Sequence, residues 1–339
     1  MISRYLITNI IYFFQFFVMR KKDLETAVVI GDRALGSFLI FRKFIFDFPL
    51  PKNKEVEIYG LLFPSPIISA SFKSDHQIIE MWLRLGLGGV ILKTIMQEKR
   101  TGNPRPRLQD AYLNGEKGLI NSLGLPGSGI NSFTETIKGA KLWEYDRPIG
   151  ISVGGENSLE YLDNVKKIDS KIHDIKKQYF YELNISCPNT ENGQTICQDP
   201  IILESLLKDI RSVTDKVISV KVSPDVSNKI LQDIGALCAN ITKVLINAGN
   251  TIYVKPGQVG VDKYNYSMNG GGLSGSPLFK RTLEMVHLFS KFNIPVMATG
   301  GISSFEHIVA AKSAGASLFG MATSLVFNPY CIPKINSKL

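Results

Sequence analysis

One pattern recurs along the sequence from residue 55 onward: a short apolar run rich in β-forming residues ends at polar or glycine residues, and helical spacing follows. Eight buried strands that alternate with helices indicate a parallel sheet, and the number eight favours a closed (β/α)8 barrel, an α/β fold of the TIM type. A doubly wound open sheet is the alternative, but no GxGxxG motif follows an early strand to support it. The eight runs occupy residues 66–71, 88–93, 148–155, 180–186, 217–223, 241–249, 295–301 and 318–323.

Polar and glycine residues gather at the carboxyl ends of these predicted strands. In a (β/α)8 barrel the catalytic residues come from these ends, which meet at one rim. A single strand-end lysine would be unremarkable, but here two lysines, several amides and a thiol converge. The long segments 94–146 and 250–280 would cover the same rim, as a lidded substrate site needs. The strand-end residues are Ser69, Ser71, Lys93, Thr94, Gly154, Asn184, Cys187, Lys221, Asn247, Asn250, Gly300, Gly301 and Thr323.

Two glycine clusters, ATGG at 298–301 and GGGLSG at 270–275, lie at or near strand ends and precede helical sequence. Backbone N–H groups in such turns can face a phosphate, and glycine permits its close approach. A phosphate site after the seventh and eighth strands recurs in (β/α)8 barrels, and Gly300, Gly301 and Thr323 fall there. Either cluster alone is also typical of a turn. Together they predict a phosphorylated cofactor or substrate.

The N-terminal region has a different pattern. Residues 5–19 form an apolar, aromatic run that ends at basic residues and is too short for a confident membrane span. Residues 23–46 have helical apolar spacing, with Asp23 as the predicted N-cap. Two such helices favour an interfacial membrane anchor, and the alternative is a helical lid packed on its own domain. We predict a helical extension over residues 1–50 and a catalytic barrel over residues 51–339.

Charge and cysteine usage narrow the class of protein further. The formal net charge of +9 suits anionic substrates, phosphates, acidic lipid or nucleic acid, and does not choose among them. The four cysteines form no CxxC pair, which argues against a zinc site, an iron–sulfur cluster within the chain or a disulfide scaffold. The four histidines show no metal-ligand spacing. We therefore predict no metal and a reducing compartment.

Six motifs occur in an order that resembles the dihydroorotate dehydrogenase family, over roughly residues 55–333. The resemblance implies an FMN-containing barrel that oxidises (S)-dihydroorotate to orotate in de novo pyrimidine (UMP) biosynthesis. The motifs are LKTIMQEKRTGNPRPR (92–107), INSLGLPGSG (120–129), ELNISCPNT (182–190), VKVSPD (220–225), GGLSGSPL (271–278) and ATGGI (298–302).

The resemblance also implies which residues hold each ligand. Lys221 would lie near the flavin N1/O2 edge, where a cation stabilises the negative charge that builds on reduction. Residues implied for the substrate are Lys93, Asn121, Ser122, Leu123, Gly124, Leu125, Asn184, Asn189, Asn250 and Thr251. Residues implied for FMN are Ala70, Ser71, Lys93, Thr94, Asn121, Asn184, Lys221, Ser274, Gly275, Gly300, Gly301, Ala322 and Thr323.

Cys187 occupies the position of the family's catalytic base, and Lys93 is the second implied catalytic residue. On its own, a cysteine at a strand end is more often a small buried hydrophobic residue. The implied reaction sends a hydride to flavin N5 and a proton to Cys187. An unperturbed thiol has a pKa of about 8.5, so a nearby cation or amide donors should help to form the thiolate.

The sequence features that distinguish the groups of this family point to different electron acceptors for this chain. Soluble members use a cysteine base and reduce fumarate, or NAD through an iron–sulfur partner subunit. Membrane-associated members use serine, carry an N-terminal helical pair and reduce quinone. This chain has Cys187 and Lys93 of the first group and the helical extension of the second, while Tyr112 stands where quinone users tend to place an arginine.

We predict a quinone acceptor and peripheral membrane contact through residues 1–46, with fumarate or NAD and a cytoplasmic location as the alternative. A homodimer is a further expectation. A flavin-dependent tRNA dihydrouridine synthase is a competing class, because it shares the barrel, FMN and a cysteine near CP. Those enzymes carry an added RNA-binding domain, which the sequence does not show, so we expect no nucleic-acid partner. A third possibility is a membrane-tethered scaffold without enzymatic activity. The set of polar residues predicted at the rim argues against it.

Overall fold

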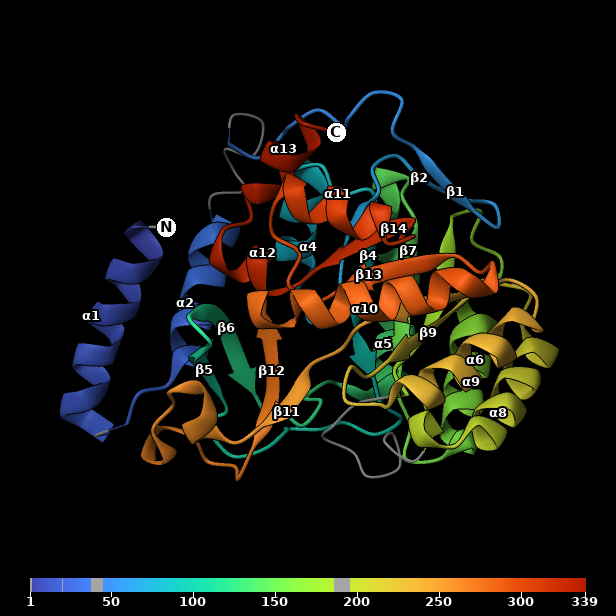
Figure 1. The fold of residues 1–339 in the computed structure, drawn as a ribbon. Coiled ribbons are helices and arrows are strands. Elements are labelled where there is room, and N and C mark those ends of the chain that lie inside the picture. The colour runs from blue at the N-terminus through green and yellow to red at the C-terminus, as the bar shows by residue number, and fades with distance from the viewer. Residues whose placement is uncertain (1, 20, 38–44, 186–195) are drawn as a thin grey trace.

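The computed structural model describes residues 2–19, 21–37, 45–185 and 196–339. Its centre is a barrel of eight parallel strands, with neighbours in the order β3-β14-β13-β10-β9-β8-β7-β4, and a parallel bridge between Ile68 and Gly89 closes it (Figure 1). The predicted α/β barrel and all eight of its strands are confirmed. The strands are β3 (Ile67–Ser69), β4 (Val90–Ile95), β7 (Ile149–Val153), β8 (Tyr179–Leu183), β9 (Ile218–Val222), β10 (Val244–Ala248), β13 (Val296–Thr299) and β14 (Leu318–Met321).

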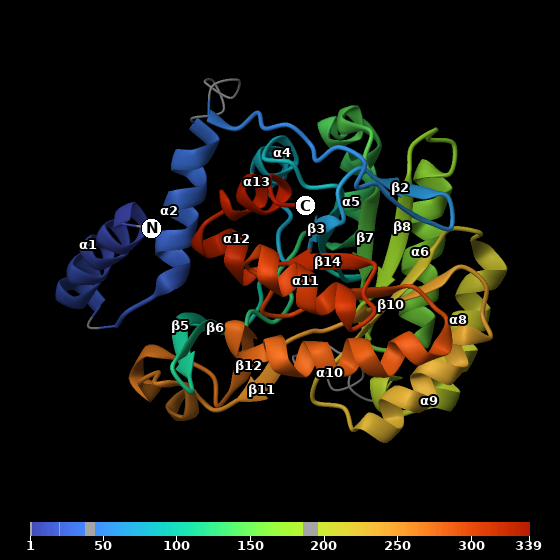
Figure 2. The same cartoon turned by 45° about the horizontal axis from the view of Figure 1, so that its top comes forward.

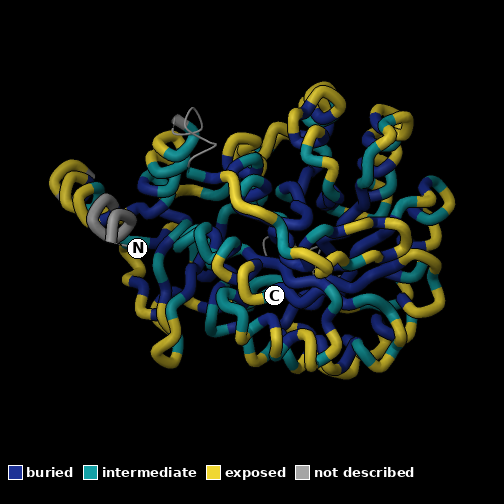
Figure 3. Tube along the Cα trace, turned by 90° about the horizontal axis from the view of Figure 1, so that it is seen from above, coloured by how far each residue is buried: buried dark blue, intermediate teal, exposed yellow. Residues whose placement is uncertain are grey.

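Helices cover the outside of the barrel, so that its strands are buried on both faces and read as continuous apolar runs (Figure 3). Asp199 caps one of them, accepting hydrogen bonds from the amides of Ile201 and Ile202. The helices are α4 (His76–Arg84), α5 (Gly129–Thr136), α6 (Ser158–Ile172), α8 (Pro200–Val213), α9 (Asn228–Ala239), α10 (Phe279–Phe289), α11 (Phe305–Ser313), α12 (Thr323–Phe327) and α13 (Cys331–Asn336). Short 3-10 turns occupy Ile137–Gly139, Lys141–Tyr145, Pro256–Val259, Lys263–Asn265, Ser276–Leu278 and Ser290–Phe292.

The amino-terminal end of the barrel is filled by a hairpin of β1 (Val56–Ile58) and β2 (Leu61–Phe63). Phe63 is fully buried and packs with Ile68, Phe180 and other inward-facing strand residues. Asn336 of α13 fastens the same end: its Oδ1 accepts from Ser65 Oγ at 2.9 Å, and its Nδ2 donates to the Gly86 carbonyl at 2.8 Å. The opposite, carboxyl end remains available for a site.

A second sheet, which the sequence analysis did not predict, is built from the two long segments expected to cover the rim. It contains β5 (Leu108–Leu113), β6 (Glu116–Asn121), β11 (Ile252–Val254) and β12 (Gly271–Gly275), antiparallel in the order β11-β12-β6-β5. Ile120 and Leu273 lie in its own small core. The cluster GGGLSG is therefore a strand in this sheet, and a 3-10 turn and α10 follow it.

The predicted N-terminal helices are α1 (Ile2–Met19) and α2 (Leu24–Ser37), and residues 38–44 lie outside the described chain. Asp23 caps α2 as predicted: its Oδ1 accepts a hydrogen bond from the Glu25 amide at 3.0 Å. Leu24 and Ala27 are buried against Leu119 of β6, and α2 lies beside β5 in both views (Figures 1 and 2). The extension therefore packs on the second sheet, as the lid alternative expected, while the division at residue 50 stays a prediction.

The outer side of the extension is apolar. Phe13, Phe14, Phe17 and Val18 of α1 are each more than 60% exposed. Across the described residues, none of the helices combines the length and apolar character needed to span a bilayer.

Candidate functional site

Three predicted residues from three different strands are joined by hydrogen bonds at the carboxyl rim. Asn184 follows β8, and its Nδ2 donates to Thr94 Oγ1 of β4 at 2.9 Å. Its Oδ1 accepts from Asn250 Nδ2, beyond β10, at 3.2 Å. The Thr94 hydroxyl also contacts Ser152 Oγ at 3.0 Å. This network fixes the amide of Asn184 in one orientation, with Asn250 Oδ1 accepting from the Thr251 amide at 2.9 Å.

A buried charge pair lies in the barrel below this network. Lys221 Nζ donates to Ser71 Oγ at 2.9 Å, and Ser71 Oγ donates to Glu182 Oε1 at 2.5 Å. Glu182 is fully buried, accepts from Asn247 Nδ2 at 2.7 Å, and lies 3.8 Å from Lys221 Nζ. An ammonium buried in a barrel needs a counter-charge, which Glu182 supplies.

Glu182 was not predicted from the sequence, and Asn247 was predicted at the rim without a role. The available signal was a carboxylate inside the otherwise apolar run FYELNIS. A charge in the middle of a buried strand is rarely tolerated unless it is paired.

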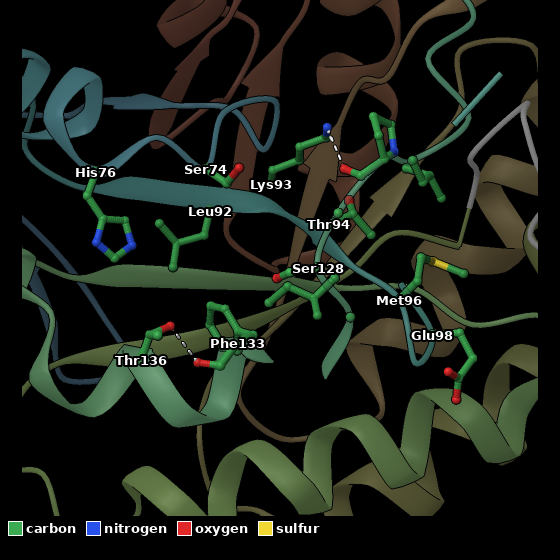
Figure 4. A pocket seen from close by; sticks show the side chains of 15 residues that line it. Ser74, His76, Leu92, Lys93, Thr94, Met96, Glu98, Ser128, Phe133 and Thr136 are labelled. Carbon is green, nitrogen blue, oxygen red and sulfur yellow. Dashed lines mark hydrogen bonds between the residues drawn. The ribbon is translucent and has the colours of Figure 1, made fainter. Parts of the chain in front are cut away.

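Lys93 lies on β4 next to Thr94 and donates from Nζ to the Pro126 carbonyl at 2.8 Å. Burial, together with the nearby Arg107 charge, lowers the pKa of Lys93 to about 8, whereas Glu25 opposes the shift. A pocket adjoins the residue, with Lys93 and Thr94 on β4 and Phe133 and Thr136 on α5 around it (Figure 4).

The segment Ser122–Leu125, predicted to touch the substrate, follows β6 and folds back over the Lys93 side of the rim. Gly124 and Leu125 adopt positive φ values of 72° and 51°, which turn the chain sharply. The Ser122 amide donates to the Arg107 carbonyl at 2.9 Å, and the Leu123 carbonyl accepts from the Asn103 amide at 3.0 Å. Asn121, the last residue of β6, donates from Nδ2 to the Gly272 carbonyl at 3.3 Å.

The predicted phosphate residues lie together between β12, β13, β14 and the starts of α10 and α12. Thr323 Oγ1 donates to Ser274 Oγ at 2.8 Å, and Ala322 is the N-cap of α12.

The three glycines of this region have positive φ values: 101° at Gly275, 138° at Gly300 and 75° at Gly301. The glycine at 301 is required by space as well, since a Cβ atom there would lie 2.7 Å from the Cβ of Phe279. Ala70 anchors the neighbouring β3, donating from its amide to the Met321 carbonyl at 2.8 Å.

Two predicted residues, the candidate base Cys187 and Asn189, belong to the segment 186–195 and lie outside the described residues. Cys197 and Cys238 are buried, and burial raises the pKa of their thiols to about 11 and about 12. Neither is suited to proton abstraction near neutral pH. Within the described residues no cluster of His, Cys, Asp and Glu could hold a metal ion.

The fold and site define a (β/α)8-barrel enzyme whose polar rim faces a glycine cradle suited to a phosphate. The family model for dihydroorotate dehydrogenase matches residues 54–339. The catalytic subunit of dihydroorotate dehydrogenase B (NAD(+)) of Bacillus thuringiensis (strain Al Hakam) is 30% identical over 299 residues, covering 84% of this chain and 90% of the relative. The equivalent subunit of Bacillus cereus (strain AH187) matches with the same identity and coverage. This chain belongs to the dihydroorotate dehydrogenase family and is an oxidoreductase of pyrimidine biosynthesis.

Solved structures agree on the fold. The ferulenol complex of DHODH from Eimeria tenella has a TM-score of 0.75 at 20% identity, covering 91% of this chain and 89% of that one. Its ligand-free form has a TM-score of 0.74, covering 91% and 93%.

Enzymes of this family are FMN-dependent flavoproteins, so the predicted cofactor is confirmed at the level of the family. The residues present fit such a group. A Cβ atom at Gly275, Gly300 or Gly301 would collide with neighbouring protein atoms, so these positions require glycine and expose bare backbone, as phosphate binding by N–H groups needs. Lys221 provides a buried cation on the same rim.

Proposed function

We propose that this chain oxidises (S)-dihydroorotate to orotate with bound FMN and passes the electrons to a quinone. The first part rests on one observation: Asn184 is hydrogen-bonded to Asn250 and to Thr94, which follows Lys93 on β4. The ammonium group of Lys221 is buried in the same barrel. A cation and fixed amides are the partners that a planar ring with a carboxylate and ring amides requires. When bound, FMN supplies the two-electron acceptor for hydrogen removed from the substrate.

On the substrate side, Lys93 pairs with the carboxylate, and the amide groups of the rim orient the ring. With a pKa of about 8, Lys93 is largely protonated at neutral pH, as this role requires. Cys187 takes the proton, which leaves the substrate carbon next to the one that loses hydride. The proposed substrate residues are Lys93, Asn121, Ser122, Leu123, Gly124, Leu125, Asn184, Asn189, Asn250 and Thr251.

On the cofactor side, the glycine cradle would hold the phosphate of FMN, and Lys221 would stabilise the negative charge that the flavin gains on reduction. Ser71 and Glu182 keep the Lys221 ammonium in place. The proposed FMN residues are Ala70, Ser71, Lys93, Thr94, Asn121, Asn184, Lys221, Ser274, Gly275, Gly300, Gly301, Ala322 and Thr323.

The exposed aromatic side of α1 supports the quinone acceptor, because it gives the protein a peripheral surface for the membrane in which quinones dissolve. Val29 and Ile30 of α2 add exposed apolar residues to the same extension. The second candidate is NAD as acceptor in the cytoplasm, through a partner subunit. It is favoured by the names of the Bacillus relatives, which are catalytic subunits of an NAD(+) enzyme.

The test separates the two half-reactions. Anaerobic mixing of the FMN-loaded protein with dihydroorotate should bleach the flavin absorbance, and Cys187→Ala should slow this bleaching on the order of 10²-fold without loss of FMN. The reduced protein is then mixed in separate experiments with a water-soluble quinone, with fumarate, and with NAD together with an iron–sulfur partner subunit, and quinone should reoxidise it fastest. A flavin that dihydroorotate does not reduce would overturn the proposed activity, and faster reoxidation by fumarate or NAD would overturn the acceptor.

A further inference from the structure

The acidic residues of the N-terminal extension face the cations around the catalytic rim. Asp23 Oδ2 accepts from Arg105 Nε at 2.7 Å. Farther along α2, Asp32 pairs with Lys73 of the loop after β3. Between them, Glu25 pairs with Arg107 of the segment that leads into β5. The extension is thus joined to the barrel's rim by charge as well as by apolar packing.

The pair of Glu25 and Arg107 has the most complete geometry of the three. Arg107 is buried, and its Nε and Nη2 donate to Glu25 Oε2 and Oε1, each at 2.9 Å. Such bidentate pairing fixes the plane of the guanidinium group. The remaining nitrogen, Nη1, donates to the carbonyls of Thr101 at 2.9 Å, Asn103 at 2.8 Å and Leu123 at 3.4 Å. One side chain therefore connects α2 to two loops of the rim.

Space around this guanidinium group is tight. Gly102 has a φ value of 78°, and a Cβ atom there would lie 2.5 Å from Arg107 Nη1 and 2.2 Å from the Leu123 carbonyl oxygen. Only glycine therefore fits at position 102, between the guanidinium group of Arg107 and the loop that carries Leu123.

From Arg107 the contacts continue to Lys93. Asn103 holds the same loop from the other side, with its Nδ2 donating to the Ser122 carbonyl at 2.8 Å. Three residues further along that loop than Leu123, the Pro126 carbonyl accepts from Lys93 Nζ at 2.8 Å. The position of the Lys93 ammonium therefore depends on where the loop 122–126 lies.

We propose that Glu25 is a positioning residue for the dihydroorotate site: it holds Arg107 against the loop 122–126 and thereby places Lys93 for the substrate's carboxylate. This inference rests on the proposed function and extends it. The extension then serves the substrate half of the reaction and not the acceptor half alone. Deleting residues 1–50 would consequently be an ambiguous test of the acceptor, since it would also remove the partner of Arg107.

The charges around Lys93 set the expected pH dependence. Burial works against ionisation of Glu25, but the hydrogen bonds and charge of Arg107, with the charges of Arg105 and Lys93, outweigh it and lower its pKa. Glu25 is thus a carboxylate at neutral pH. Burial lowers the pKa of Lys93 most; the charges of Arg107 and Lys73 also lower it, and Glu25 raises it. Neutralising Glu25 leaves the Arg107 charge unopposed, so the pKa of Lys93 falls below its present value.

The experiment uses the full-length, FMN-loaded protein and the variant Glu25→Gln. Flavin reduction is followed against dihydroorotate concentration from neutral to alkaline pH, and orotate binding is measured by calorimetry. We expect the apparent Kd of dihydroorotate and of orotate to rise on the order of tenfold, with a smaller change in the limiting rate of reduction. As the pH rises, binding to the variant should begin to weaken at a lower pH than binding to the wild-type protein, because Lys93 of the variant loses its proton at a lower pH.

Two further variants make the result specific. Glu25→Asp keeps the charge and should restore the wild-type pH profile in large part. Glu204→Gln removes a carboxylate from an exposed pair with Lys208 on α8, and should leave binding and profile unchanged. A Glu25→Gln protein with wild-type Kd values and pH profile overturns the inference. The same assay shows whether dihydroorotate reduces the flavin of the wild-type protein. Failure of the proposed activity is therefore distinguished from failure of the role of Glu25.

Discussion

Glu182 is the residue at which several polar side chains of the barrel interior meet. Glu182→Gln would replace an acceptor oxygen by an NH2 group facing donors, and would leave the Lys221 ammonium buried without its counter-charge. We expect a loss of unfolding free energy on the order of 3 kcal/mol, measured by denaturant titration. Glu284→Gln, which removes an exposed partner of Arg281, is the matched control and should unfold like the wild-type protein. Equal stability of the Glu182 and Glu284 variants would contradict the pairing.

At this scale the sequence revealed residues in the last part of a strand or just after it, such as Lys93, Thr94 and Asn184, because their place follows directly from the strand pattern. It did not reveal Glu182 or Arg107. The role of each depends on partners far away in the chain: Lys221 for the first and Glu25 for the second. A pattern read within one short window contains no information about such partners.

Among the helices and strands, α1 has the exposed apolar side that we expect to bind a membrane. Replacing Phe13 and Phe17 by serine removes two exposed aromatic side chains. Each contributes about 2 kcal/mol when buried in an apolar phase, so the double variant should bind lipid vesicles at least tenfold more weakly in a sedimentation assay. Flavin reduction by dihydroorotate should not change.

The control variant carries serine substitutions at two exposed apolar residues outside α1. Leu159 of α6 and Ile201 of α8 are 71% and 79% exposed, so their serine variants lose comparable exposed apolar surface. If vesicle binding fell equally in both double variants, or in neither, α1 would not be the membrane-facing element.

Strands and helices of the barrel were predictable because each is a local pattern: the strands are short continuous apolar runs, and the helices have helical apolar spacing. The antiparallel sheet was not, since it pairs residues such as Asn121 and Gly272 that lie far apart in the chain. Its strand β12, GGLSG, has little β-propensity of its own. The same glycines that suggested a phosphate turn are needed where backbones approach closely, as at Gly275 beside Gly118.

For the whole molecule, the seam between β3 and β4 decides whether the barrel closes. Gly88 donates its amide to the Ile67 carbonyl at 2.8 Å, and a Cβ atom at this glycine would lie 1.8 Å from the Ser65 carbonyl oxygen. Gly88→Ala should therefore cost about 3 kcal/mol of unfolding free energy and lower the Tm. Gly139→Ala, where a Cβ atom meets open space, is the control and should keep the wild-type Tm. A Gly88 variant that melts with the control would show that the seam tolerates a shift.

The fastening of Ser65 by Asn336, together with the pairing of β3 with β14, has a consequence for synthesis of the protein. While the ribosome is still translating, β3 has one edge without its neighbour until residue 321 has left the exit tunnel. A nascent barrel of this kind exposes a bare strand edge for most of its translation, and that edge is where a chaperone or a misfolding partner would first attach.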